Sequence, residues 1–280
     1  MIIVGVDGSV AARAAVEWAA GDAARRHVPL QIVHVTDTSW YLVGKRPDAV
    51  LPDSVHKEGR RVLREAEALV RERQPSAEIT TREMEGTPAE VLRELAGDAT
   101  ELVVGSRGLG GLSGALLGSV SAHVAGHVRC PVVVVRAEHR PVHGEVVVGL
   151  DDSPECEPAL AYAFEQAQLR GATLRAVLAW QLPVHAYAPE APYDLDEVRA
   201  TQHQAIRDRV KAAGHDHPQV TVVEDAPCAH PADALITAAE QADLLVVGSH
   251  GRGAVGAALL GSVSRGVLHH ARCPVAVVRA

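Results

Sequence analysis

The chain has 280 residues, of which 47% are hydrophobic, and it carries a formal net charge of −8. This length suits two domains that each bury a core, and the composition excludes a disordered chain. No basic face for nucleic acid is evident, no apolar run reaches the length of a membrane span, and we expect no secretory signal. Four cysteines without a dense disulfide framework favour a location in the reducing cytoplasm. We expect no nucleic-acid partner and no membrane partner.

The first half alternates apolar segments with helix signals. Strands are expected at residues 1–7, 30–35, 78–82, 102–104 and 131–135. Ser9 is a typical N-cap for the first helix. Thr87, followed by a proline and then by a glutamate, is a strong helix-start signal. With two further helices beginning at Ser54 and Ser119, the predicted order is β-α-β-α-β-α-β-α-β.

The same order returns in the second half. Residues 137–144 are polar and include a proline, which indicates a linker. Strands are then expected at 145–150, 173–180, 220–224, 244–247 and 274–278. Asp7 corresponds to Asp151, and a period of about half the chain indicates gene duplication. We therefore predict two domains, at residues 1–138 and 145–280.

The alternation of strands and helices predicts the fold class. It indicates α/β architecture, with two tandem doubly wound domains that each have a five-stranded parallel sheet. In such sheets a ligand lies where the strand order reverses; if strands one and four are neighbours, Asp7 and Gly105 face that crevice. The final strands, 131–135 and 274–278, would be apolar sheet edges. We expect them to pair with each other, giving an intramolecular pseudo-dimer, or with a second chain in a homodimer.

Two glycine-rich loops carry the chemistry. Each follows the fourth strand of its half with the spacing G-x-x-G-x9-G-S, at Gly105, Gly108, Gly118 and Ser119, and at Gly248, Gly251, Gly261 and Ser262. Glycines let the backbone approach a ligand, and successive N–H groups form an anion-binding concavity. A helix that starts after the last glycine favours a phosphate. Asp7 suits a ribose hydroxyl or an adenine amine.

These loops differ from the common phosphate loops. They contain no lysine, unlike the Walker loop, and they do not follow the first strand, as a Rossmann loop would. Arg107 and Arg252 are the cationic residues of the two loops, but they do not occupy equivalent positions. Each could contact a phosphate or be a solvent-exposed residue at the tip of its loop. The 15 histidines form no metal-binding pattern. Cys130 and Cys273 are interpreted as small buried hydrophobic residues.

The chain resembles tandem universal stress proteins of the ATP-binding branch over nearly its whole length. The resemblance rests on Asp7 in VGVDGS, on both glycine loops, and on the RCPVVVV and RCPVAVV segments. It implies an adenine nucleotide in each half. The candidate site residues are Gly5, Asp7, Val35, Gly105, Arg107, Gly108, Gly118, Ser119 and Val120, and then Gly149, Asp151, Trp180, Gly248, Gly251, Arg252, Gly261, Ser262 and Val263. Trp180 replaces a smaller aliphatic residue and would stack on or crowd the base.

Three functions remain open at this stage. The first is an ATP-binding regulatory protein of the stress response, in which phosphates and water hold any accompanying Mg²⁺. The second is a slow ATP hydrolase, or an enzyme that phosphorylates itself on a loop serine such as Ser113 or Ser119. The third is a scaffold with vestigial sites. We find no catalytic constellation and no metal ligands in the sequence.

Overall fold

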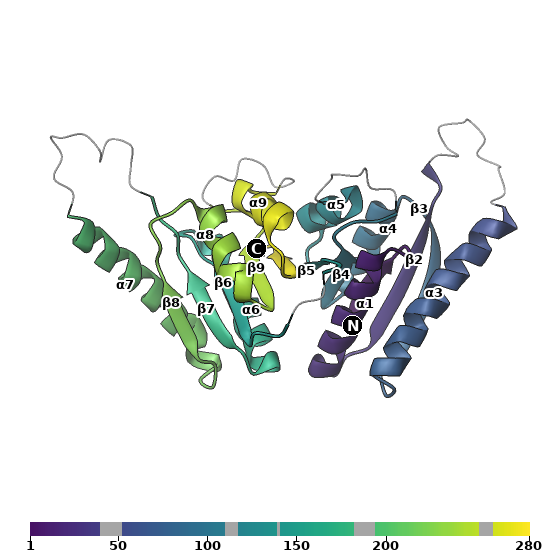
Figure 1. Ribbon diagram of the computed structural model, residues 1–280, viewed down its shortest axis with the longest axis horizontal. Helices are drawn as coiled ribbons and strands as arrows, with labels where there is room; N and C mark the ends of the chain where they lie inside the picture. Colours follow the sequence, from purple (N-terminus) through teal and green to yellow (C-terminus); the bar gives the residue numbers. More distant parts are fainter. Residues whose placement is uncertain (40–51, 110–116, 139–140, 182–193, 252–259) are drawn as a thin grey trace. The chain divides into compact units, whose positions relative to one another are not determined.

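The computed structural model describes residues 1–39, 52–109, 117–138, 141–181, 194–251 and 260–280 (Figure 1). Two compact units divide the chain, Met1–His139 and Arg140–Ala280, and are called the first and second half below. Each half is a parallel α/β unit, and the fold class predicted from the sequence is confirmed. No helix of the described residues is long and apolar enough to cross a membrane.

The first half contains one parallel sheet with helices on both faces. Its elements are β1 (Ile2–Val6), α1 (Val10–Arg26), β2 (Leu30–Asp37), α3 (Asp53–Arg73), β3 (Ile79–Gly86), α4 (Pro88–Leu95), β4 (Glu101–Gly105), α5 (Ser119–His127) and β5 (Val132–Val135). The strand order is β3-β2-β1-β4-β5, and these pairs are parallel. Strands one and four are therefore neighbours, as the switch-point prediction requires.

The second half repeats this arrangement. Its elements are β6 (Glu145–Gly149), α6 (Glu157–Arg170), β7 (Thr173–Val177), α7 (Leu195–Ala213), β8 (Val222–Asp225), α8 (Pro231–Ala238), β9 (Leu244–Gly248), α9 (Ser262–His270) and β10 (Val275–Val278). The strand order is β8-β7-β6-β9-β10, again in parallel pairs. The pairing of β5 with β10, or of either strand with a second chain, stays a prediction.

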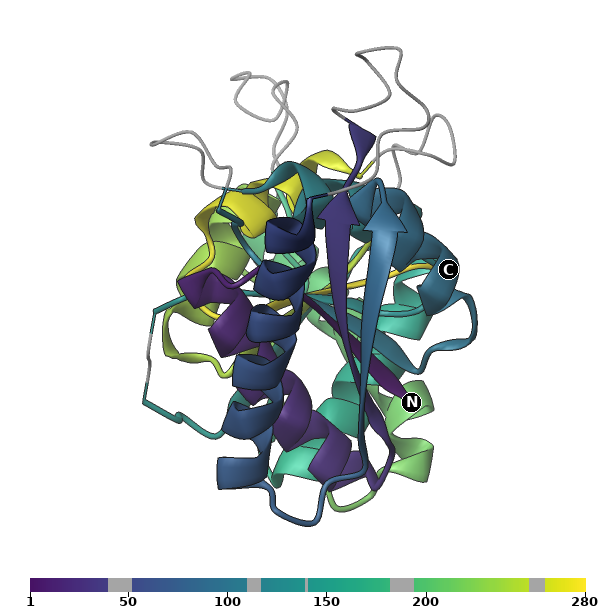
Figure 2. The ribbon, with the colours of Figure 1, turned by 90° about the vertical axis from the view of Figure 1, so that its right-hand side faces the viewer.

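Opposite faces of β1 meet different helices. In Figure 2, α1 and α3 lie together on one side of β2 and β3. Val6 lines a groove together with side chains of α1 and α3. A Cβ on the preceding residue, Gly5, would lie 2.9 Å from a methyl carbon of Leu92 on α4. Because successive strand residues face opposite sides, α4 covers the face that α1 and α3 do not.

Small side chains bring α1 close to the sheet. Ala11, Ala15 and Ala19 recur at helical spacing and are buried. They lie against the central strand, in which Ile2 and Ile3 are fully buried. This close packing fixes the first turn of α1 beside the carboxyl ends of β1 and β4, where the candidate site lies.

Several element boundaries differ from those expected. β3 continues to Gly86 instead of ending at residue 82, because it pairs with β2 along the full length of both strands. Thr87 is the N-cap of α4, but its side chain makes no capping hydrogen bond. In the second half, a 3-10 turn at Pro154–Cys156 precedes α6. β7 ends at Val177, and beyond it Trp180 forms an isolated bridge with Cys228.

The Ser9 cap provides a test of the packing at this edge. The Ser9 hydroxyl accepts a hydrogen bond from the N–H of Ala12 and donates one to the carbonyl of Arg107. We expect Ser9→Ala to destabilise the first half by about 1–2 kcal/mol, measured by urea denaturation. Thr87→Ala is the matched control, and we expect it to cost a few tenths of a kcal/mol, since Thr87 makes no capping bond. Equal losses from both substitutions would show that the Ser9 contacts contribute nothing.

Candidate functional site

Asp7 touches the glycine loop across the switch point. One oxygen, Oδ1, accepts the N–H of Ser9 at 3.0 Å, and the other, Oδ2, accepts the N–H of Leu109 at 2.9 Å. A Cβ on Gly108 would lie 2.4 Å from Oδ2. The carboxylate thus holds both the turn before α1 and the start of the loop, and Gly108 makes the close approach feasible.

Hydrogen bonds close the base of the loop. The N–H of Ser106 donates to the Val135 carbonyl at 2.7 Å, and that of Gly118 donates to the Ser106 carbonyl at 2.8 Å. The Ser121 hydroxyl donates to the Gly105 carbonyl at 2.6 Å. Both ends of the loop are therefore fixed to the sheet and to each other.

The second half has the same construction. Asp151 Oδ1 accepts the N–H of Ser153, and a Cβ on Gly251 would lie 2.2 Å from its Oδ2. At the loop base the N–H of Ser249 donates to Val278, and that of Gly261 donates to Ser249. The Ser264 hydroxyl donates to Gly248 at 2.6 Å, matching Ser121. The aspartate turn, the close approach of the glycine and the closed loop base therefore recur in both halves.

The helices that follow the loops begin without a side-chain cap. Gly118 and Gly261 are the N-caps of α5 and α9, and no side chain of the described residues caps either helix. By contrast, the Ser9 side chain caps α1. Ser119 and Ser262, the first residues of the two helices, are exposed. An uncapped N terminus presents N–H groups and the positive end of the helix dipole, which together suit an anion.

The universal stress protein family model matches residues 1–136 and 144–279. The chain belongs to this family. Universal stress protein Rv2005c of Mycobacterium tuberculosis is 37% identical over 290 residues, covering 99% of this chain and 96% of the relative. Rv2623 of the same organism is 35% identical over 289 residues, covering 99% and 96%.

A solved universal stress protein shares the fold. The crystal structure of one from Archaeoglobus fulgidus superposes with a TM-score of 0.73, at 22% identity, covering 99% of this chain and 97% of that one. The two glycine loops of this chain therefore belong to two universal stress protein domains in tandem.

The strand register corrects the expected role of Trp180. Gly5 pairs with Val33, and the equivalent Gly149 pairs with Val177. Val33 and Val177 are therefore equivalent positions. Two residues after them, Val35 corresponds to Ala179, and one residue further Thr36 corresponds to Trp180. The bridge from Trp180 to Cys228 agrees with this register. The second half of this universal stress protein therefore has a small aliphatic residue at the position of Val35, and the Trp180 indole N–H instead donates to the Ala226 carbonyl.

The structure also corrects the interpretation of Gly105. A Cβ there would lie 2.7–2.9 Å from backbone atoms of Ala11 and Ala12 in α1. Because Gly105 has no side chain, helix α1 can pack directly against it. We had expected this space to be occupied by a ligand. Gly149 likewise admits the side chain of Leu235, as Gly5 admits that of Leu92. These glycines shape the site by close packing around it.

The remaining candidate residues are placed as follows. Arg107 is exposed at the start of its loop, whereas Val35, Val120 and Val263 are half-buried. Arg252 and Ser113 lie outside the described residues. The described residues contain no group of three or more side chains suited to a metal ion. Burial raises the pKa of the Cys130 thiol to about 12, so it stays protonated, and Cys273 is buried.

The sequence interpretation missed the serines that close the loop bases. Ser121 and Ser264 each follow the loop glycine by three residues, in the segment GSVS that occurs in both halves. That repeated serine was the available signal. His34 was also not assigned to the site, although its Nδ1–H donates to the carbonyl of Val6, the residue before Asp7.

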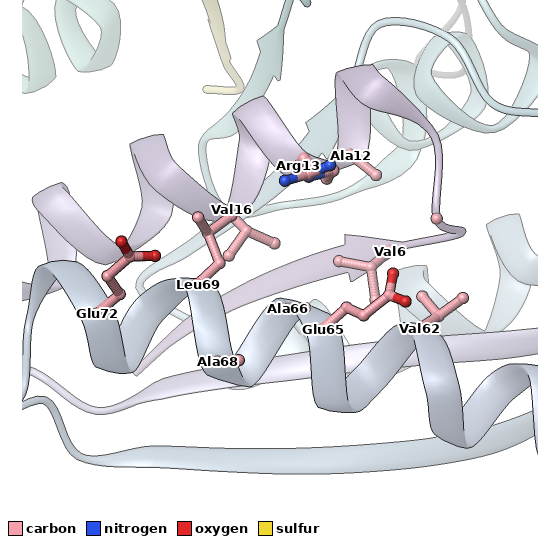
Figure 3. Close-up of a pocket in the computed structure, with 11 residues that line it drawn as sticks. Val6, Ala12, Arg13, Val16, Val62, Glu65, Ala66, Ala68, Leu69 and Glu72 are labelled. Carbon is pink, nitrogen blue, oxygen red and sulfur yellow. The ribbon is translucent and has the colours of Figure 1, made fainter.

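A groove lies on the face of the sheet that α1 and α3 cover. It has a volume of about 390 Å³ and runs between α1 and α3 (Figure 3). Val6, Val16, Val62 and Leu69 supply apolar lining, and none of the described glycine-loop residues lines it.

Proposed function

We propose that each half binds an adenine nucleotide, ATP with accompanying Mg²⁺, and that the chain is a regulatory protein of the stress response. The observation that carries this proposal is the duplicated site: a strand-one aspartate against a glycine loop that leads to an uncapped helix. The same contacts occur at Asp7 with Gly108 and at Asp151 with Gly251. Family membership supports it, since the loop spacing resembles that of the ATP-binding branch.

The two ends of a nucleotide suit the two ends of this site. The first-turn N–H groups at Ser119 and Val120, with the Ser119 hydroxyl, would bind phosphate oxygens, and Ser262 and Val263 would do so in the second half. The Asp7 carboxylate accepts two backbone N–H groups and retains further lone pairs. It would therefore accept a ribose hydroxyl while still holding the loop.

A binding role is favoured over turnover. Phosphoryl transfer needs charge stabilisation at the transferred group, and neither loop contains a lysine. Arg107 is an exposed residue, and its counterpart by position in the second loop is His250. Bound Mg²⁺ would be held mainly by phosphate and water oxygens. We therefore expect nucleotide turnover to be slow or absent.

Ligand analysis tests this function directly. Mass spectrometry of small molecules released from freshly purified protein should detect an adenine nucleotide. Calorimetry on protein stripped of ligand should give two ATP molecules per chain, with Mg²⁺ present and with EDTA as its control. Protein that carries no adenine nucleotide and binds none in calorimetry would contradict the proposal and favour a scaffold with vestigial sites.

A further inference from the structure

A polar cluster lies between α3 and the sheet in the first half, and is called the His34 cluster below. Its members are His34 and Thr36 on β2, Glu83 and Glu85 on β3, and His56 on α3. In the register of the sheet, His34 pairs with Glu83 and Thr36 with Glu85. A Cβ on Gly59 of α3 would lie 2.8 Å from Glu83 Oε1 and 2.9 Å from His34 Cδ2. The cluster therefore occupies the sheet face that α3 covers.

The hydrogen bonding of this cluster is incomplete. Thr36 Oγ1 and Glu83 Oε1 are buried and have no hydrogen-bond partner among the described residues. His34 donates its Nδ1–H to the Val6 carbonyl at 2.9 Å, so the neutral ring has a bare Nε2. That Nε2 and Glu83 Oε1 lie within 3.3 and 2.8 Å of the same point beside Gly59. Both acceptors therefore lie beside Gly59, on the side of α3 that faces the sheet.

The second half shows that the fold does not need this cluster. By register, Leu178 replaces His34, Trp180 replaces Thr36, and Ala226 replaces Glu83. The Trp180 indole donates to the Ala226 carbonyl, so its polar atom is satisfied. Apolar packing at the same positions supports the same strand order. Buried polar atoms without hydrogen-bond partners lower the stability of the first half, and the apolar residues of the second half avoid this cost. The cluster therefore indicates a role other than folding.

The first turns of α3 depend on this cluster. The buried side chains of α3 begin at Val62, and among residues 53–58 Val55 and His56 are half-buried while the others are exposed. No side chain of the described residues caps the helix. His56 Nδ1 lies 3.5 Å from Glu83 Oε1, and its Nε2 lies 4.0 Å from Glu85 Oε1. These two contacts are the main polar link between the first turns and the sheet.

We propose that the His34 cluster is a proton-operated latch, in which protonated His34 and His56 bind Glu83 and Glu85 and hold the first turns of α3 on the sheet. The protons come from solvent, and histidine is the side chain that proteins most often use as a pH switch. A cation at the start of a helix opposes the dipole, and the two carboxylates offset this. The latch is closed at low pH and opens as the pH rises.

Other charged groups around the latch are exposed or already paired. Those on α3 are Asp53, Lys57, Glu58 and Arg61, and those on the strands are Asp7, Asp37 and Arg82. Arg61 binds Glu58 and Glu65, and this ion pair holds the pKa of Glu58 below its usual value. Asp37 accepts the N–H of Ser39, and Asp7 holds the loop. Among the residues that the structure describes, Glu83 and Glu85 are therefore the carboxylates that remain for the imidazoles.

The latch also adjoins the candidate nucleotide site, an extension that rests on the proposed function. His34 precedes Val35, the residue that family resemblance assigns to adenine, and its Nδ1–H holds the carbonyl beside Asp7. A closed latch fixes this end of β2 and so organises the pocket before the nucleotide arrives. Nucleotide affinity in the first half should rise on acidification, and that in the second half should not.

Hydrogen exchange of residues 53–58 tests the latch without any nucleotide. After correction for intrinsic rates, we expect protection of these amides to be roughly fivefold higher at pH 6 than at pH 8. That factor is the one expected from the free energy of a half-exposed ion pair.

The double variant His34→Leu/Glu83→Ala carries the residues of the second half and should lose this pH dependence. His56→Gln, at a half-exposed position, should reduce it while sparing the core. His215→Gln, an exposed histidine of the second half, is the matched control. The same pH dependence in wild type and in both cluster variants would overturn the latch.

Calorimetry at both pH values tests the link to the site. We expect ATP to bind the first half about fivefold more tightly at pH 6 than at pH 8, and the double variant to abolish that difference. Latch behaviour in hydrogen exchange without nucleotide binding would refute the proposed function and leave the latch intact. Nucleotide binding with pH-independent protection of residues 53–58 would refute the latch and leave the function intact.

Discussion

Gly105→Ala should destabilise the first half by about 2–3 kcal/mol, because the new Cβ would overpack a backbone that cannot move aside easily. The added carbon would lie 2.7–2.9 Å from backbone atoms of Ala11 and Ala12, within the first turn of α1. Urea denaturation, followed by a probe in each half, gives the loss. Weaker nucleotide binding should accompany it, as a consequence of the displaced helix.

Gly248→Ala is the matched control for this substitution. The nearest atom to its new Cβ is the His250 carbonyl oxygen, at 3.1 Å, and no α-helix backbone lies in the way. We expect its cost to be under about 1 kcal/mol. If Gly105→Ala left stability unchanged while abolishing nucleotide binding in the first half, direct contact of Gly105 with the ligand would be the better account.

Asp7→Ala should weaken ATP binding in the first half about 100-fold. A hydrogen bond to a charged group contributes about 1.5–3 kcal/mol, and the loop loses its anchor at Leu109 as well. Calorimetry should then detect one strong site per chain instead of two. Asp151→Ala should remove the other site, and the double variant should lose both.

The control for the aspartate substitutions must remove a carboxylate elsewhere. Asp98 is exposed and lies just before β4, at the end of that strand remote from the glycine loop. Asp98→Ala should therefore leave both nucleotide sites unchanged. Normal stoichiometry and affinity in the Asp7→Ala/Asp151→Ala variant would refute the site assignment, whatever its effect on stability.

The sequence predicted those features that local patterns determine. Apolar runs separated by helix signals predicted the alternating elements, and Ser9 predicted the start of α1. The repeated loop spacing, combined with the rule that ligands lie at strand-order reversals, placed Asp7 and Gly105 at the same end of the sheet, and the structure shows the Asp7 carboxylate against Gly108. Parallel neighbours β1 and β4 then brought the aspartate and the glycine into contact.

Features that depend on neighbours in space could not be predicted. The apolar run after residue 173 gave no register, so Trp180 was matched to Val35, although pairing with β6 and β8 aligns it with Thr36. Sequence also does not show what a missing side chain faces, and Gly105 faces α1. The His34 cluster arises only where two strands and a helix meet, and its members are far apart in the sequence.

The closed bases of the glycine loops have a consequence for protein engineering. Each loop is fastened by two backbone hydrogen bonds and one serine hydroxyl, with the same donors and acceptors in both halves. The described residues just after Ser106 add further contacts, since the Arg107 carbonyl accepts from Ser9, the Leu109 N–H donates to Asp7, and a Cβ at Gly108 would meet that carboxylate. A loop transplanted into the first half would therefore have to keep a glycine at position 108, as well as the fastenings at its base, to leave the strands beneath it unaltered.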